Sequence, residues 1–89
     1  METMDKSGTA TDSLGELVAY IASSIVDDPT QVQVDHIVGE STIMFELSVA
    51  PGDVGRVIGK KGRTANAIRT LLRAVSGHLG KRTSLEIIS

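Results

Sequence analysis

Four residues, Gly59-Lys60-Lys61-Gly62, join two stretches of helical pattern and leave no room for a flexible connection. A very short helix is predicted before them, from Val54 to about Ile58. A longer one is predicted after them, from Arg63 to about Leu79. Glycine at both ends of the linker allows backbone conformations that other residues avoid, and it lets a ligand approach the backbone closely. We therefore expect two helices joined by a tight, basic turn.

A further helix is predicted near the start of the chain, from Ser13 to Val26. Ser13 and Glu16 have the spacing of a capping box. Asp27-Asp28-Pro29 ends the helix, because the residue before a proline avoids the helical region. Apolar residues recur at helical spacing and form one stripe: Leu14, Leu17, Val18, Ile21 and Ile25. The small, polar residues 1–12 are expected to form a disordered tail.

Three strands are predicted from alternating apolar and polar residues. Gln31–Val38 and Thr42–Ala50 should form an antiparallel hairpin, and Thr83–Ile88 is the last strand. Gly80 is expected to end the preceding helix. The strand residues expected to face the core are Val32, Val34, Val38, Ile43, Phe45, Leu47, Val49, Leu85 and Ile87. The long helix should contribute Ala65, Ile68, Leu72, Val75 and Leu79.

This order of helix, strand, strand, short helix, long helix and strand predicts an α+β fold. The economical arrangement is a three-stranded sheet with all helices on one face and a polar opposite face. The 89 residues provide one domain, expected over residues 13–89. No apolar stretch approaches the ~20 residues of a membrane span. The first residues lack the apolar core of a signal peptide, so a soluble, cytoplasmic protein is expected.

Catalysis and metal binding find little support in the composition. Cysteine is absent, which excludes a disulfide framework, a thiolate metal site and a cysteine nucleophile. His36 and His78 are far apart in the sequence, which disfavours a metal centre that uses both. No carboxylate pair or nucleophile–base pair stands out. We therefore predict a protein that is not an enzyme and has no cofactor or metal.

Charge is strongly segregated along the chain. Residues 1–53 hold ten of the eleven acidic residues and one basic residue, Lys6, whereas residues 54–89 hold eight basic residues and one acid, Glu86. Such segregation favours a region that attracts a polyanion, although basic residues that simply coat a solvated helix would give the same pattern. The helix after the glycine turn also begins with unpaired amides and a partial positive charge, which suit phosphate.

The candidate binding residues surround this turn. A nucleotide-hydrolysing loop is disfavoured, because three residues instead of four separate Gly55 from Gly59 and no hydroxyl follows Lys60. A ligand would lie over an aliphatic groove of Val57, Ile58, Ala65 and Ile68, each of which has a core interpretation as well. The residues predicted to form the binding site are Arg56, Val57, Ile58, Gly59, Lys60, Lys61, Gly62, Arg63, Asn66, Arg69 and Arg73.

The run from Asp53 to Thr64, followed by Ala67–Leu72, resembles the small bacterial single-KH-domain RNA-binding proteins of the KhpA type. The resemblance covers about residues 14–88 and implies a type II KH domain whose loop clamps about four nucleotides of single-stranded RNA. It also implies a cytoplasmic RNA chaperone linked to cell-wall growth (peptidoglycan homeostasis), cell length and cell shape. A larger KH-containing RNA-binding protein of the KhpB or Jag type is the implied partner.

Two further interpretations concern protein contacts. The chain could instead be a protein-interaction subunit of a larger RNA-binding complex, with little RNA contact of its own. Leu71 lies about 80° from the centre of the long helix's apolar stripe. If the inward face is already filled, Leu71 is exposed and suits a symmetric contact, which predicts a weak homodimer. The alternative is that Leu71 packs against the helix at Ser13–Val26.

Overall fold

The computed structural model describes residues 6–77 and 80–89, and over these residues the elements follow the predicted order. The helices are α1 (Lys6–Ile25), α2 (Val54–Ile58) and α3 (Arg63–Ser76), and the strands are β1 (Gln33–Val38), β2 (Thr42–Ser48) and β3 (Arg82–Ile88). Short 3-10 turns cover Pro29–Gln31, Pro51–Asp53 and Lys60–Gly62.

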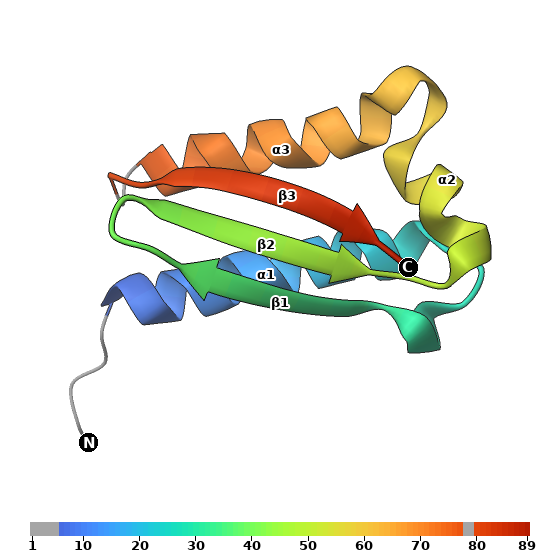
Figure 1. Cartoon of the computed structure of the whole chain (residues 1–89), viewed down its shortest axis with the longest axis horizontal. Helices are drawn as coiled ribbons and strands as arrows, with labels where there is room; N and C mark the ends of the chain where they lie inside the picture. Colours follow the sequence, from blue (N-terminus) through green and yellow to red (C-terminus); the bar gives the residue numbers. More distant parts are fainter. Residues whose placement is uncertain (1–5, 78–79) are drawn as a thin grey trace.

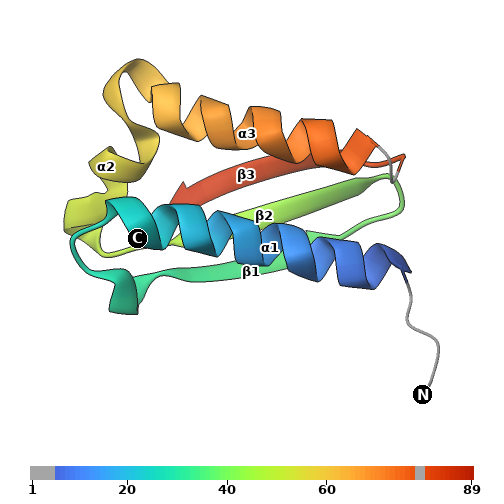
Figure 2. The ribbon, with the colours of Figure 1, turned by 180° about the vertical axis from the view of Figure 1, so that it is seen from behind.

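The three strands form one sheet in the order β1-β2-β3. The hairpin of β1 and β2 is antiparallel and pairs Gln33 with Ser48. Strands β2 and β3 are parallel, with Thr42 opposite Arg82, because α2 and α3 return the chain to the end of the sheet at which β2 begins. Helices α1 and α3 lie side by side on one face and run in opposite directions (Figures 1 and 2). The predicted α+β fold with its helices on one face is confirmed.

The core lies between the helices and the sheet and contains the predicted alternating residues of the central strand. Its buried apolar residues are Leu14, Val18, Ala22, Ile43, Phe45, Leu47, Val49, Val57, Ile68, Leu72 and Leu85. Successive core residues of α1 and α3 are four positions apart, which places them on one helix face. Among the described residues, no helix is both long enough and apolar enough to span a membrane.

The predicted start of the first helix is wrong. Helix α1 begins at Lys6, so it includes residues 6–12, which were assigned to the disordered tail. Ser13 and Glu16 therefore lie inside the helix and do not form its N-terminal cap. The polar side chain of Thr11 is buried on the core face, and an apolar pattern cannot reveal such a position. Residues 1–5 lie outside the described part of the chain.

The end of the long helix also differs from the prediction. Helix α3 ends at Ser76. Leu79, the predicted last residue, and His78 lie outside the described residues. Ser76, which the predicted apolar stripe does not include, is buried, and its Oγ lies 3.5 Å from Thr83 Oγ1 on β3. The helix end therefore meets the sheet through a polar contact, and Val75, which was expected in the core, is 43% exposed.

The edge strand β1 is less covered than predicted. Val34 is half-buried, but Val38, which was also expected in the core, is exposed. On α1, Leu17 and Ile25 are exposed rather than buried. Helix α1 packs on β1, but the edge position of β1 leaves the end of the strand at Val38 open to solvent.

Candidate nucleic-acid interface

The turn between α2 and α3 is built from left-handed backbone conformations. Gly59, Lys61 and Gly62 have φ angles of 80°, 58° and 76°. The N–H of Gly62 donates to the carbonyl of Gly59 at 3.0 Å, and the N–H of Gly59 donates to the carbonyl of Gly55 at 2.9 Å. Residues other than glycine rarely adopt a positive φ, and here Lys61 does so. The chain thus reverses within four residues, as the sequence predicts.

The two glycines of the turn are needed for different reasons. A Cβ atom on Gly59 would contact the side chain of Thr64 and would lie only 2.8 Å from Thr64 N. A Cβ atom on Gly62 would meet only Asn66 Nδ2, at 3.7 Å. Gly59 therefore allows the turn to pack directly on the first turn of α3, whereas Gly62 is required by its backbone angle alone.

Three cations surround the turn. The side chains of Lys60, Lys61 and Arg63 are exposed, and within the described residues none of them forms an ion pair with a carboxylate. Gly62 precedes α3, and no described side chain caps this helix. The N–H of Arg63 already donates to the carbonyl of Lys60, so the start of α3 offers its next amides and the positive end of the helix dipole beside the three cations. This arrangement suits a phosphate group.

A polar strip continues along the side of α3 that faces β3. Arg69 donates from Nη1 to Asn66 Oδ1 at 3.3 Å and from Nη2 to the carbonyl of Leu85 at 3.1 Å. Arg73 donates to Thr70 Oγ1 at 3.3 Å and is exposed. The predicted grouping of Asn66, Arg69 and Arg73 on one side of the helix is therefore what the structure has. Arg69 is half-buried and held in place by the free edge of β3.

Arg56 is placed differently from the other predicted cations. Its Nη2 atom lies 3.0 Å from Asp27 Oδ2, and its Nε atom lies 3.5 Å from Asp53 Oδ1. These two carboxylates offset the charge of Arg56. The side chain thus connects α2 to the segment that follows α1, and its charge is not free to act at the turn.

Asp53 immediately precedes α2 but does not cap this helix. No side-chain hydrogen bond caps α2. The Asp53 carboxylate is buried and instead accepts from the backbone N–H groups of Asp27 and Asp28 at 3.0 and 3.1 Å. It therefore fixes the segment that leaves α1 against the segment that enters α2.

Ile58 is the one exposed member of the predicted aliphatic groove. It is 38% exposed, whereas Val57, Ala65 and Ile68 are buried in the core. For those three the core interpretation holds, and the Val57 side chain is not available to a ligand. In the described part of the chain, no group of three or more histidine and acidic side chains could hold a metal ion.

The arrangement of helices and strands, with a Gly-x-x-Gly turn between two helices, defines a KH domain. Solved structures of similar fold include Era in complex with MgGDPNP and nucleotides 1506–1542 of 16S ribosomal RNA, with a TM-score of 0.61 and 23% identity over 84% of this chain and 29% of that one. Aquifex aeolicus Era bound to GDP and AlF4⁻ gives a TM-score of 0.62 and 22% identity over 85% and 30% of the two chains. At such identity the likeness shows the fold alone.

The family model for the KH domain of KhpA and KhpB matches residues 15–87, so this chain belongs to that family. One relative named RNA-binding protein KhpA, from Caldanaerobacter subterraneus subsp. tengcongensis, is 52% identical over 84% of this chain and 100% of its own. Those of Clostridium acetobutylicum and Chlamydia trachomatis are 51% and 48% identical over 82% of this chain, covering 97% and 94% of their own length. The resemblance predicted from the sequence is confirmed.

Proposed function

We propose that this protein is a non-catalytic RNA-binding module that holds the backbone of single-stranded RNA against the turn at Gly59–Gly62. The observation that carries the proposal is the turn itself, where Lys60, Lys61 and Arg63 stand beside the uncapped start of α3. Phosphate contacts of this kind position a strand without reading its bases. The names of the curated relatives support RNA as the ligand.

The proposed RNA path runs from the turn along the side of α3 that faces β3. Ile58 offers an exposed apolar contact for a base, and Asn66, Arg69 and Arg73 extend the polar surface. None of these residues is aromatic, so base stacking on a protein ring does not contribute along this path. The expected binding is weak and tolerant of sequence. Such binding suits a cytoplasmic RNA chaperone, and the link to cell-wall growth and cell shape stays a prediction from the family resemblance.

The test replaces Lys60 and Lys61 together by aspartate. The change shifts the charge by four units at exposed positions, so it should leave folding intact, because exposed charges contribute little to stability. Binding of a labelled single-stranded RNA of mixed sequence should fall at least about tenfold. If three to four phosphates are neutralised, the log–log dependence of affinity on salt should have a slope of about −2 to −3 in the wild type, at ~0.7 per phosphate, and be shallower by about one in the variant.

The matched control is Lys81→Asp with Arg82→Asp. It makes the same charge change at the start of β3, at the opposite end of the sheet from the turn (Figure 1). This control should retain most of the RNA affinity at 0.15 M salt, where charges are screened beyond about 8 Å. Wild-type RNA affinity in a folded Lys60→Asp/Lys61→Asp protein would refute the proposal. It would favour the alternative of a protein-interaction subunit.

We also propose that the protein forms a weak homodimer through the other side of α3. Leu71 is 46% exposed and lies one helical turn from the exposed Val75, whereas Arg69 and Arg73 point to the opposite side. The exposure of Leu71 argues against its burial on α1. A second copy related by a two-fold axis would cover this apolar surface and leave both RNA turns free. A larger partner of the KhpB or Jag type would compete for the same surface.

A further inference from the structure

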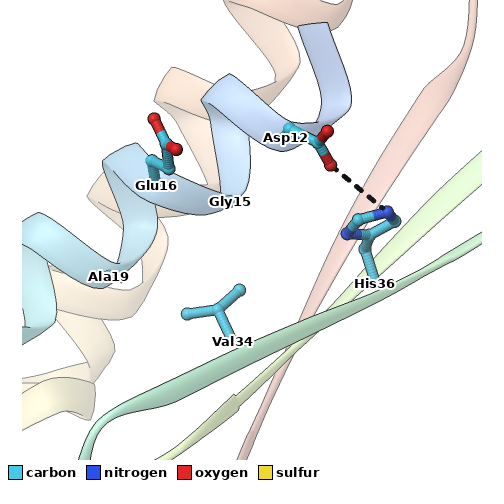
Figure 3. Close-up of a pocket in the computed structure, with 6 residues that line it drawn as sticks. All are labelled: Asp12, Gly15, Glu16, Ala19, Val34 and His36. Carbon is cyan, nitrogen blue, oxygen red and sulfur yellow. Dashed lines mark ion pairs between the residues drawn. The ribbon is translucent and has the colours of Figure 1, made fainter. Parts of the chain in front are cut away.

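A groove runs along the edge of the sheet formed by β1. On β2, the side chains that face the helices are completely buried, but on β1 the corresponding Val34 is half-buried and His36 is exposed. Helix α1 packs along β1 but leaves this edge partly open to solvent. The space between them is an open cavity of about 340 Å³, lined by Asp12, Gly15, Glu16, Ala19, Val34 and His36 (Figure 3).

Among the described residues, no strand pairs with the outer edge of β1, so its backbone has free hydrogen-bonding groups along this groove. In the hairpin, the N–H of Gly39 donates to the carbonyl of Thr42 at 2.7 Å, and hydrogen-bonded pairs alternate from there. The N–H and C=O groups of Val34, His36 and Val38 therefore point away from β2, to the free edge. The same residues have their side chains on the helix side. One strip of the surface thus combines an unpaired strand edge with a side-chain groove, which is the geometry used in strand addition.

The residues of α1 that line the groove are either small or acidic. Gly15 and Ala19 lie one turn apart on α1, and a Cβ atom on Gly15 would make only ordinary contacts of 3.8 Å with Phe45 and Val34. Small residues at both positions leave the groove open. Asp12 is turned across it toward His36, with Oδ1 3.9 Å from Nε2, whereas the Glu16 carboxylate points away from Val34 and His36 at the outer rim (Figure 3).

We propose that this groove docks an extended, basic peptide segment of another protein, which adds to β1 as a fourth strand. Its lysine or arginine side chains would extend beneath α1 toward Asp12 and Glu16, and its apolar residues would lie on the open face beside Ile37, which is 55% exposed. Charge decides the class of occupant, because residues 1–53 hold ten acidic residues and one basic residue. That field repels nucleic acid and acidic peptides.

The proposed site is independent of the proposed RNA path. The groove lies on the edge of the sheet formed by β1, whereas the RNA path follows the opposite edge, formed by β3. The strand order therefore allows both ligands to be bound at once. A failure at one edge leaves the conclusion about the other edge intact.

The probe is a capped peptide, Thr-Lys-Val-Lys-Val-Lys-Thr, titrated into the ¹⁵N-labelled full chain. Binding should shift the amide signals of Val34, His36 and Val38 and slow their hydrogen exchange by about tenfold or more. A peptide with glutamate in place of lysine should bind at least about tenfold more weakly, because like charges then face each other. N-methylation of the peptide amides that face β1 should abolish the protection.

Two variants test the walls of the groove. Ala19→Leu fills the space and should abolish peptide binding without changing RNA affinity, whereas Ser13→Leu, at an exposed position of the same helix, should have no effect on either. Asp12→Lys with Glu16→Lys should weaken the binding of the lysine peptide by about tenfold or more. The matched charge change, Glu46→Lys with Glu86→Lys, should leave this binding unchanged.

Three outcomes would overturn the proposal. The first is the absence of protection at the β1 amides with the lysine peptide. The second is equal binding of the lysine and glutamate peptides. The third is protection that rises with protein concentration when no peptide is present, since a second copy would then occupy the edge.

Discussion

Replacing Asp53 by alanine should destabilise the domain more than any single change in its exposed charges. The carboxylate is 3% exposed and accepts two backbone N–H groups, from Asp27 at 3.0 Å and Asp28 at 3.1 Å, while Arg56 Nε lies 3.5 Å away. It joins the segment after α1 to the start of α2. Alanine removes the acceptor and leaves both amide donors in a partly buried site.

The magnitude follows from these contacts. A hydrogen bond to a charged group contributes about 1.5–3 kcal/mol, and an unsatisfied buried donor costs about 1–3 kcal/mol. Because the two amides are only partly buried, water recovers part of the loss, and we expect about 2–4 kcal/mol in total. The total stability of such a domain is roughly 5–15 kcal/mol. In a chain of this size, the change corresponds to a fall in Tm on the order of 10–20 °C.

Urea unfolding of the full chain measures this loss, and Asp27→Asn is the matched control. Asp27 makes the shorter contact with Arg56, at 3.0 Å, but both side chains are more than half exposed, so its loss should cost less than about 1 kcal/mol. Asp53→Asn keeps the shape but directs an NH₂ group at one of the amides, so it should resemble Asp53→Ala. A loss below about 1 kcal/mol for Asp53→Ala, or an equal loss for Asp27→Asn, would refute the reasoning.

Two further predictions concern the glycine turn and the apolar side of α3. Gly59→Ala should cost about 2 kcal/mol or more, because strain at positive φ is joined by the clash with Thr64, whereas Gly62→Ala should cost about 1 kcal/mol. Urea unfolding gives both values, and the reverse ranking would contradict the structure. Leu71→Asp should leave folding unchanged and shift sedimentation from dimer to monomer; a wild type that is monomeric at the highest concentration tested would contradict the dimer.

The sequence predicts a helix or strand well when the burial of each residue depends only on which face of the segment it occupies. Strand β2 alternates without interruption, and its inward residues from Ile43 to Leu47 are all buried as expected, as is Val49 just after the strand. Helix α2 has the predicted bounds, because Pro51 and Gly59 limit it on both sides. The N-terminal part of α1 has no such signal. Its core-facing residue there is Thr11, and a polar residue is invisible to a search for apolar periodicity.

Side-chain roles are harder to predict when they depend on a partner distant in sequence. Arg56 is close to the glycine turn in sequence, and this proximity alone predicts that its charge belongs to the binding surface. Its partner Asp27 lies at the end of α1, and only the folded chain brings the two together. The same holds for Asp53, whose acceptors face the amides of Asp27 and Asp28 rather than the helix that it precedes. The position of Asp53 just before α2 suggests a helix cap, but local spacing cannot predict its hydrogen bonds to a distant segment.

The segregation of charge in the sequence becomes a segregation in space because of the topology. The acidic part of the chain forms α1, β1 and the central strand β2, and the basic part forms α2, α3 and β3. With the strand order β1-β2-β3, the two parts lie at opposite edges of one sheet. A net charge of −2 therefore does not prevent the binding of a polyanion. The charge distribution favours a polyanion at the edge formed by α3 and β3 over the groove at β1, as the two proposals require of a single small domain with ligands of opposite charge.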